Sequence, residues 1–555
     1  MAKYAIGLDF GSLSVRALMI DIVSGAEVAQ SVFEYPHRIM DHHLPSGERL
    51  PGTFALQDPQ DYLEGMMDTI QNVVRISGAM PEEVVGIGVD ATGTTIMPVT
   101  ADKKPLCATA RFAGEPQAYL KMWKHHGGEA QAERINQIAE DRCEKWLSLY
   151  GGKVSSEWVF PKILETLELA PAVYDAADYF IDAVDWIVWQ LTDQLVRSGC
   201  VMGYKAFYRA DSGYPDRDFF AAVNPRLVDV ATDKLAGEIK PVGSRAGVLS
   251  ERMAAILGLA MGTPVGTGIL DAHASVAGSG VTRAGEMMIV MGTSSCHMLL
   301  SDTEKGMPGV AGVVKDGIMP GTYGLEAGQS CVGNGFAWFV EHCVPESYEQ
   351  EARDRGLNIH QLLTDKLKDY RAGQSGLLCL DWFNGVRSPL ADFDLNGMML
   401  GLNLQTKPEE MYLSIIEATA FGTRLIIEQF ENAGMPIESV VLSGGIPMKN
   451  PMIVQVYADI IKRPIRISGT TQACATGAAI LGIAAAGEKA TGYADMQAAA
   501  RAIGKIRPEV YTPNPDNTAV YDGLYADYKI LCDYFGRGAN DVMKRLNKVR
   551  LERAH

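Results

Sequence analysis

An internal repeat is the feature that most constrains how this chain folds. The segment FGSLSVRALMID (10–21) aligns with MGTSSCHMLLSD (291–302), and each reads as a strand, a turn of glycine and hydroxyl residues, and a second strand. A second pair, AMPEEVVGIGVDATG (79–93) and GMPIESVVLSGGIP (434–447), follows in the same order, each after a predicted amphipathic helix, at 59–77 and 408–433. Repetition in the same order predicts a duplicated α/β domain.

The chain has 555 residues, too many for a single hydrophobic core. Glycines and small residues gather in GSGVTRAGE (278–286), directly before the second copy of the repeat. We therefore predict an N-terminal domain over 1–283 and a C-terminal domain over 284–555. The segment TAVYDGLYADYKILCDYF (518–535) predicts a helical tail at the end of the second domain.

Charge and cysteine usage exclude several classes of protein. The net charge of −17 argues against binding to nucleic acid or to an anionic membrane surface. The nine cysteines are dispersed and form no C-x-x-C pair, which favours reduced thiols over a disulfide framework or a zinc site. No apolar run reaches the roughly 18 residues of a membrane span, and the N-terminus lacks the apolar region of a signal peptide. We expect a cytoplasmic protein.

The first copy of the repeat carries the parts of a phosphate and metal site. Asp9 ends a buried strand, where a carboxylate can hold Mg²⁺ directly or through water. Gly11 lets backbone N–H groups approach phosphate oxygens, and Ser12 and Ser14 add hydroxyl donors. A plain β-hairpin would explain the same residues.

The second copy offers Gly292 and Thr293, but Val290 stands where Asp9 stands in the first copy. This asymmetry fits a nucleotide held between the two halves with a metal on one side only. It also fits a repeat that has diverged without function.

A strand that runs into Gly444 and Gly445 could seat adenine and ribose, because glycines leave room for a flat group on the backbone. A helix is expected to begin near Asn450 and Pro451, and its N-terminus favours anions. The alternative is a tight strand-to-helix turn.

Asp271 lies among small residues at the start of a predicted helix, next to the domain boundary. A phosphoryl-transfer enzyme needs a group that accepts the proton of the acceptor hydroxyl, and Asp271 is placed for that role. The alternative is a helix N-cap. His273 is expected to be a packed or hydrogen-bonded imidazole.

No Walker or Rossmann nucleotide motif is present. Instead these four pieces, in this order, resemble the FGGY carbohydrate kinases, and the resemblance extends over nearly the whole chain. It implies two duplicated actin/hexokinase-like (ribonuclease H-like) domains, each built on a mixed five-stranded sheet, with a central cleft for ATP and sugar. The turn Thr92-Gly93-Thr94 is similar to that of the family members that act on L-ribulose.

The resemblance implies a reaction and a set of roles. The γ-phosphoryl group of Mg²⁺-ATP passes to the terminal hydroxyl of L-ribulose, giving L-ribulose 5-phosphate in L-arabinose catabolism. Asp271 is the catalytic base and Asp9 orders the metal. The sugar is bound by Gly93, Lys205, Asp271 and Glu326; the nucleotide is bound by Gly11, Ser12, Ser14, Gly292, Thr293, Gly444, Gly445 and Asn450.

At two places this sequence gives weaker support for the roles that the family resemblance implies. The local sequence around Lys205 and Glu326 reads as ordinary surface charge. A third glycine is common in the family after the pair at 444–445, and here the residue is Ile446.

Three alternatives remain open at this point. One is a xylulokinase-like or broad pentulose and pentitol kinase. Another is an ATPase switch of the actin or heat-shock type that has no phosphoryl acceptor. The third is a sugar-binding relative that has lost catalysis. A homodimer is expected from the resemblance alone.

Overall fold

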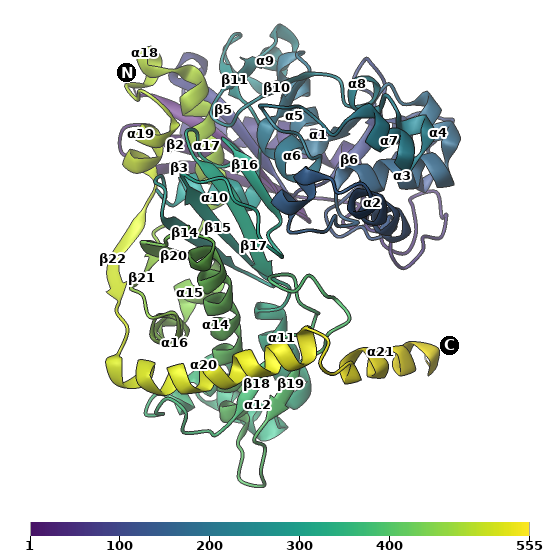
Figure 1. Ribbon diagram of the computed structural model, residues 1–555. Helices are drawn as coiled ribbons and strands as arrows, with labels where there is room; N and C mark the ends of the chain where they lie inside the picture. The colour runs from purple at the N-terminus through teal and green to yellow at the C-terminus, as the bar shows by residue number, and fades with distance from the viewer. Residues whose placement is uncertain (1, 554–555) are drawn as a thin grey trace.

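The computed structural model describes residues 2–553, which form two halves, each built around a mixed seven-stranded sheet (Figure 1). The first sheet has the order β11-β12-β5-β1-β2-β3, with β13 beside β5. Its strands are β1 (Tyr4–Phe10), β2 (Ser14–Asp21), β3 (Glu27–Glu34), β5 (Val84–Ala91), β11 (Arg245–Val248), β12 (Pro264–Gly266) and β13 (Ile269–Leu270).

The second sheet has the order β16-β17-β15-β14-β20-β21-β22. Its strands are β14 (Glu286–Met291), β15 (Ser295–Ser301), β16 (Gly312–Lys315), β17 (Tyr323–Gln329), β20 (Ser439–Ser443), β21 (Ile465–Ser468) and β22 (Ile506–Tyr511).

The two sheets share one pairing pattern, which confirms the predicted duplication. From β3 to β11, neighbouring strands pair antiparallel, antiparallel, parallel, parallel and antiparallel, and the series from β17 to β22 is the same. The expectation of five strands in each sheet is wrong, since each sheet has seven. The additional strands include the two-residue β13 and the exposed edge strand β22, which have no buried alternating pattern to find in the sequence.

Helix α17 (Ala473–Ala486) packs on the first sheet, and α10 (Asp271–Gly278) packs against α17 and reaches strands of both sheets. A Cβ atom on Gly7 would lie 1.9 Å from the carbonyl oxygen of Ala475, and one on Gly88 would lie 1.8 Å from that of Ala478. Only glycine permits such an approach of helix and strand. α17 therefore belongs to the second half of the sequence but packs on the sheet of the first (Figure 1).

The two helices that precede the second repeat pair are α1 (Pro59–Ser77) and α14 (Pro408–Asn432). The side chain of Asp58 accepts a hydrogen bond from the backbone N–H of Gln60, and α1 ends at Gly78 in a left-handed conformation. Both helices start where the sequence predicted, and α14 ends one residue earlier.

A large insertion follows β5 in the first half. It contains a set of short helices and the strands β6, β7 and β8, which form a sheet of order β4-β7-β6-β8 together with β4 from the segment before β5. The strands are β4 (Leu56–Gln57), β6 (Ile96–Val99), β7 (Leu120–Lys121) and β8 (Tyr179–Asp182), with the pair β9 (Val196–Ser198) and β10 (Glu238–Lys240) nearby. The helices are α2 (Glu129–Asp141), α3 (Val159–Leu169), α4 (Pro171–Ala176), α5 (Ala183–Thr192), α6 (Gly199–Lys205), α7 (Arg217–Val223), α8 (Val230–Asp233) and, before β12, α9 (Glu251–Leu257).

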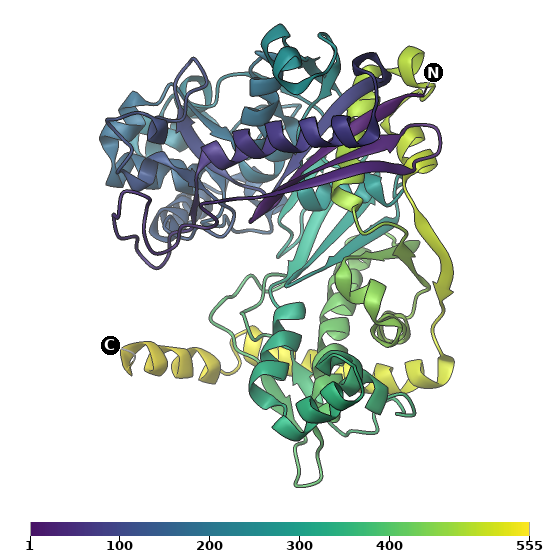
Figure 2. The same cartoon turned by 180° about the vertical axis from the view of Figure 1, so that it is seen from behind.

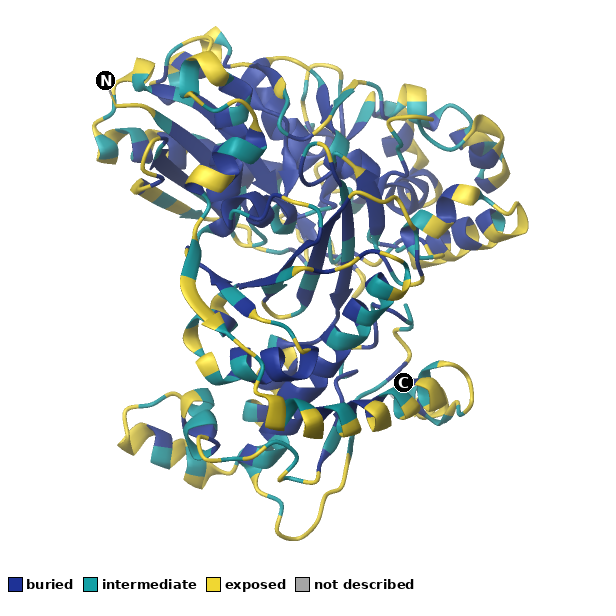
Figure 3. Cartoon of the chain, turned by 60° about the vertical axis from the view of Figure 1, so that its left-hand side comes forward, coloured by how far each residue is buried: buried dark blue, intermediate teal, exposed yellow. Residues whose placement is uncertain are grey.

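The second half carries its own helices and ends in a helical tail. In this tail α20 (Pro515–Gly536) crosses the second half, and α21 (Val542–Arg553) projects beyond it (Figure 2). The tail buries Tyr521, Tyr525 and Tyr528 against α14, while much of its outer face is exposed (Figure 3). The other elements are α11 (Gly333–Cys343), α12 (Glu346–Asp354), α13 (Ile359–Lys366), β18 (Leu378–Leu380), β19 (Met398–Leu400), α15 (Gly445–Lys449), α16 (Pro451–Ile461), α18 (Glu488–Thr491) and α19 (Met496–Ile503).

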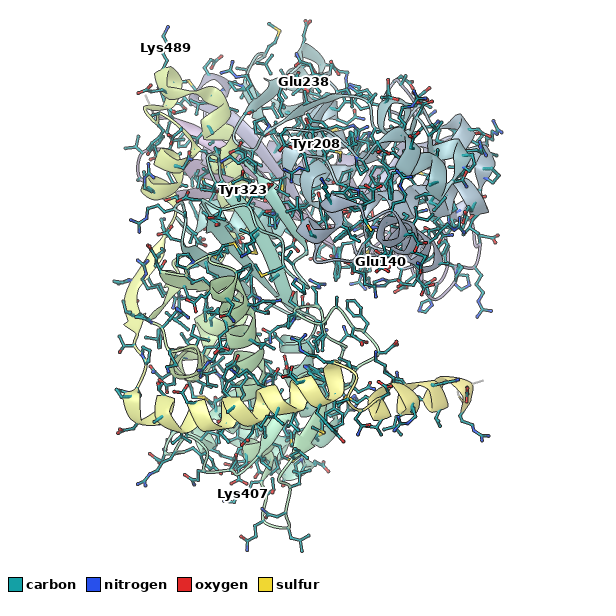
Figure 4. The ribbon with its side chains drawn as sticks, in the orientation of Figure 1. Glu140, Tyr208, Glu238, Tyr323, Lys407 and Lys489 are labelled. Atoms are coloured by element: carbon teal, nitrogen blue, oxygen red, sulfur yellow. The ribbon has the colours of Figure 1, made fainter. Side chains whose placement is uncertain are left out.

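The two halves meet along the edge of the second sheet. Tyr208 of the insertion and Tyr323 of β17 line one pocket at this junction, whereas Lys407 lies at the opposite end of the second half (Figure 4). Among the helices within 2–553, none combines the length and the apolar character that crossing a membrane would require.

Candidate active site

The carboxyl ends of three neighbouring strands bring three acids together. Asp9 on β1 stands directly opposite Asp90 on β5, and Asp90 stands opposite Ile269 on β13. Asp271 directly follows the last residue of β13 and begins α10. The ends of parallel strands are the usual place for ligands in an open α/β sheet. The structure therefore places Asp271 beside the end of β5, whose Asp90 is the neighbour of Asp9.

Asp271 is partly exposed at the first position of α10, and its Oδ1 accepts a hydrogen bond from the backbone N–H of Ala272 at 2.7 Å. The N-cap position belongs to Leu270, so the reading of Asp271 as an N-cap is wrong. Burial raises the pKa of Asp271 to about 7; the Ala272 N–H opposes this, and the charges of Asp9 and Glu326 add to it. A carboxylate with this pKa is a competent general base near neutral pH.

Lys205 and Glu326 form a shielded ion pair beside Asp271. Lys205 Nζ donates to Glu326 Oε2 at 3.1 Å, and His273 Nε2 lies 3.4 Å from the same oxygen. The side chains of Lys205 and Glu326 are only 7% and 12% exposed, so their interpretation as ordinary surface charges is wrong. Burial alone would raise the pKa of Glu326, but Lys205, His273 and Arg387 hold it well below its usual range. The group is a rigid pair of one donor and one acceptor.

His273 is packed and hydrogen-bonded, as expected. Its ring is buried, and Nδ1 lies 3.1 Å from the sulfur of Cys200. Burial lowers its pKa from the ordinary value.

Gly93 lies against the residue that precedes Asp271. A Cβ atom on Gly93 would be 2.0 Å from Cδ2 of Leu270. The N–H of the neighbouring Thr92 donates to the carbonyl of Phe10 at the end of β1. The structure thus brings Gly93 close to Asp271, and the charges of Lys205 and Glu326 act on the Asp271 carboxylate.

In each glycine turn the N–H of the glycine bonds a carbonyl within the turn, but the first turn is one residue longer than the second. The N–H of Gly11 donates to the carbonyl of Ser14 at 2.9 Å, and the N–H of Gly292 donates to the carbonyl of Ser294 at 2.9 Å. Each turn closes a hairpin; Gly11 is partly exposed and Gly292 is exposed. The hydroxyl of Ser12 accepts a hydrogen bond from the indole N–H of Trp123 at 3.0 Å, which fixes that side chain.

The second turn contacts the segment at the start of α11. The carbonyl of Thr293 accepts hydrogen bonds from the N–H groups of Val332 and Asn334, and the carbonyl of Gly292 accepts one from Gly333. α11 therefore begins on this turn. Sequence reasoning missed Gly333 and Asn334, although the segment VGNGF between a strand and a helix was a visible signal.

The glycine pair that follows β20 has one constrained and one free member. Gly444 has φ +103°, and a Cβ there would lie 2.2 Å from the carbonyl oxygen of Met291, next to Gly292. Gly445 is exposed and has no heavy atom within 4 Å of a Cβ position. The side chain of Asn450 accepts from the N–H of Ile453 at 3.4 Å and caps α16. The expected helix begins at Pro451, preceded by the short α15.

Sequence reasoning also missed Asp90. It is fully buried beside Asp9, and within residues 2–553 neither of its carboxylate oxygens meets a hydrogen-bond donor. Burial and the charges of Asp9 and Asp271 hold its pKa well above the usual range. The signal was the acid at the end of β5, which mirrors the acid at the end of β1.

Clusters of three or more His, Cys, Asp or Glu side chains arranged for a metal are absent from the described part of the chain. Mg²⁺ does not need one, because it is bound by one or two carboxylates together with water and phosphate oxygens. Asp9 and the unpartnered Asp90 give an all-oxygen donor set that fits this ion.

Comparison with known proteins gives consistent matches along the chain. Residues 4–278 match the N-terminal domain of the FGGY family of carbohydrate kinases, and residues 287–486 match its C-terminal domain. The protein named Ribulokinase in Bacillus licheniformis is 49% identical over 97% of this chain and 98% of its own length. The Ribulokinase of Anoxybacillus flavithermus is 46% identical over 98% and 96%.

Solved structures agree at the level of the fold. Gluconate kinase from Lactobacillus acidophilus superposes with a TM-score of 0.80 at 18% identity, over 97% of this chain and 99% of that one. Xylulose kinase from Rhodospirillum rubrum gives a TM-score of 0.77 at 22% identity, over 96% and 98%.

Proposed function

Because this chain belongs to the FGGY family of carbohydrate kinases, we propose that it transfers the γ-phosphoryl group of ATP to the terminal hydroxyl of L-ribulose. The products are L-ribulose 5-phosphate and ADP, a step of L-arabinose catabolism. The observation that carries the substrate assignment is the identity of 49% and 46%, over nearly the full length, to two proteins named Ribulokinase. The proposed general base for this transfer is Asp271.

Asp271 is the general base in this proposal. It accepts the proton of the sugar hydroxyl as the hydroxyl oxygen forms its bond to the γ-phosphorus and the bond to the β–γ bridging oxygen breaks. Its pKa of about 7 lets it be ionised near neutral pH and still bind a proton in the transition state. Such a reaction depends on positioning and charge more than on covalent catalysis.

The sugar is held beside this base. Lys205 donates to a sugar oxygen, and Glu326 accepts from a sugar hydroxyl while remaining paired with Lys205. Gly93 supplies a surface without a side chain on which the sugar backbone rests. Because donor and acceptor are fixed to each other, they recognise a defined pair of hydroxyl groups.

The glycine turns hold the nucleotide. Gly11, Ser12 and Ser14 approach the phosphates from the first half, and Gly292 and Thr293 approach them from the second. Gly444, Gly445 and Asn450 lie on the adenosine side. The side-chain oxygen of Asn450 already caps α16, so its contact with adenosine goes through the backbone or the amide nitrogen.

Asp9 would hold Mg²⁺, with Asp90 directly beside it on the neighbouring strand β5. When bound, this ion neutralises charge on the transferring phosphoryl group. Burial raises the pKa of the Asp9 carboxyl, and the charge of Arg16, its cross-strand neighbour, partly opposes this rise.

A panel of D- and L-ketopentoses and pentitols with Mg-ATP, scored as kcat/KM, tests the proposal. We expect the highest value for L-ribulose, with the phosphate on the terminal carbon by ³¹P NMR. A higher kcat/KM for xylulose would replace the proposal with a xylulokinase-like activity. ATP hydrolysis that no sugar stimulates would favour an ATPase switch instead.

A further inference from the structure

The Thr92–Thr95 turn, which carries Gly93, leads from β5 to β6 and is held mainly by side chains from the insertion. Two buried charges reach it from different elements. Lys162 extends from α3, and Asp182 ends β8, the antiparallel partner of β6. Lys162 is fully buried and Asp182 is 1% exposed.

Both charges act on one peptide group. Lys162 Nζ donates to the carbonyl oxygen of Thr94 at 2.8 Å, and Asp182 Oδ2 accepts from the N–H of Thr95 at 3.0 Å. These two atoms belong to the same planar Thr94–Thr95 peptide unit. A cation therefore faces the negative end of this peptide dipole, and an anion faces its positive end.

Lys162 has no carboxylate within salt-bridge distance in the described chain. Its other acceptors are the carbonyl oxygens of Met122 at 2.9 Å and Lys121 at 3.3 Å, so all three ammonium protons are directed to backbone oxygens. Burying an ammonium group in this way costs free energy that an apolar side chain of similar length would not. We therefore expect that Lys162 is buried here because it fixes the orientation of the Thr94 carbonyl.

Asp182 is fixed in turn by the chain that follows it. Its Oδ1 accepts from the N–H of Val184 at 3.1 Å and caps α5. The turn is thereby tied to the start of a fully buried helix. On the other side, Thr92 is tied to β1 through the carbonyl of Phe10.

We propose that Lys162 and Asp182 are positioning residues that orient the Thr92–Thr95 turn for the sugar and thereby set the affinity for the sugar, leaving the affinity for ATP unaffected. The inference rests on the proposed function, in which Gly93 lines the sugar site. Neither residue touches the reacting atoms. Lys162 acts through the carbonyl of Thr94, and Asp182 acts through the N–H of Thr95.

Lys162→Met tests the proposal, with Lys121→Met as the matched control. Lys121 is also buried, at 2% exposure. Its Nζ bonds Glu165 Oε2 at 2.8 Å, Thr166 Oγ1 at 2.7 Å and the backbone carbonyl of Lys162 at 2.9 Å, but it makes no hydrogen bond to the turn itself. Both variants are expected to lower the unfolding temperature. Only Lys162→Met should raise the KM for the sugar, by about tenfold or more, the effect of losing a hydrogen bond to a charged group.

The same preparations give a second readout that does not depend on turnover. The rise in unfolding temperature caused by the sugar should shrink in Lys162→Met and persist in Lys121→Met, while the rise caused by ATP should be alike in both. Asp182→Asn, which keeps the shape of the side chain, provides the same comparison if Lys162→Met does not fold. We expect it to raise the KM for the sugar while the KM for ATP stays within about twofold.

The proposal is overturned if Lys162→Met, or Asp182→Asn in its place, has a sugar KM within about twofold of Lys121→Met, or if the KM values for sugar and ATP rise together. Failure of the L-ribulose assignment is a separate result. If the wild-type protein prefers another pentulose, the variants are compared with that sugar, and the positioning role is judged on the same criteria.

Discussion

Lys205 Nζ lies 3.1 Å from Glu326 Oε2 and joins the last residue of α6 in the first half to the middle of β17 in the second. The pair is shielded from solvent and His273 closes it from the side. It therefore links the two halves at the position where the sugar is proposed to bind. Neither charge has this partner in its local sequence.

Lys205→Met leaves the Glu326 carboxylate shielded and without its ammonium partner. We expect a lower unfolding temperature, because breaking a buried pair costs about 3–5 kcal/mol. We also expect a much higher KM for the sugar, because Lys205 is the proposed donor to a sugar oxygen. The double variant Lys205→Met/Glu326→Gln removes the unpaired charge, so it should regain stability without regaining sugar binding. Thermal unfolding and sugar KM check this. A double variant less stable than Lys205→Met would show that the pair is not coupled in this way.

The glycine pair at the end of β20 gives two opposite expectations. Gly445→Ala meets open space, so it should unfold at the wild-type temperature, and a higher KM for ATP would report contact with the nucleotide. Gly444→Ala meets the carbonyl of Met291 at 2.2 Å at a positive φ, so it should destabilise the protein. Paired melting curves and ATP kinetics test both. A destabilised Gly445→Ala variant would contradict the geometry.

The sequence predicted the parts of this fold that repeat or have a strong period. The order of elements in 10–21 and 291–302 gave the duplication, and the apolar period gave α1 and α14 almost to the residue. Asp271 could be singled out because helix start and domain boundary coincide in one short segment. Local patterns of this kind do not depend on tertiary contacts.

Tertiary contacts decided what the sequence could not show. The pairing of Lys205 with Glu326 crosses 121 positions, and the approach of α17 to β1 and β5 joins the two ends of the chain. Lys162 reads locally as an ordinary helical lysine, and only the fold directs it to the Thr94 carbonyl. Short strands such as β13 exist only because a neighbouring strand pairs with them.

The dependence of kcat/KM on pH should report Asp271. In the proposed reaction the Asp271 carboxylate accepts a proton, so only its ionised form should be active. Because burial raises its pKa to about 7, kcat/KM for the sugar should rise with pH up to about 7 and then level off. Steady-state kinetics from pH 5 to 9 with saturating Mg-ATP would measure this. A flat profile down to pH 5, where an ordinary aspartate stays ionised, would contradict the raised pKa.

The most direct test of the account is kcat for Asp271→Asn, with L-ribulose and Mg-ATP at saturation. Loss of the base should lower kcat by at least ~100-fold, while the affinity for ATP, measured by calorimetry, stays near the wild-type value. The substitution keeps the shape of the side chain and removes its ability to accept the proton. A kcat within a few-fold of wild type would show that Asp271 is not the base, and that the acids at the ends of β1, β5 and β13 serve another purpose.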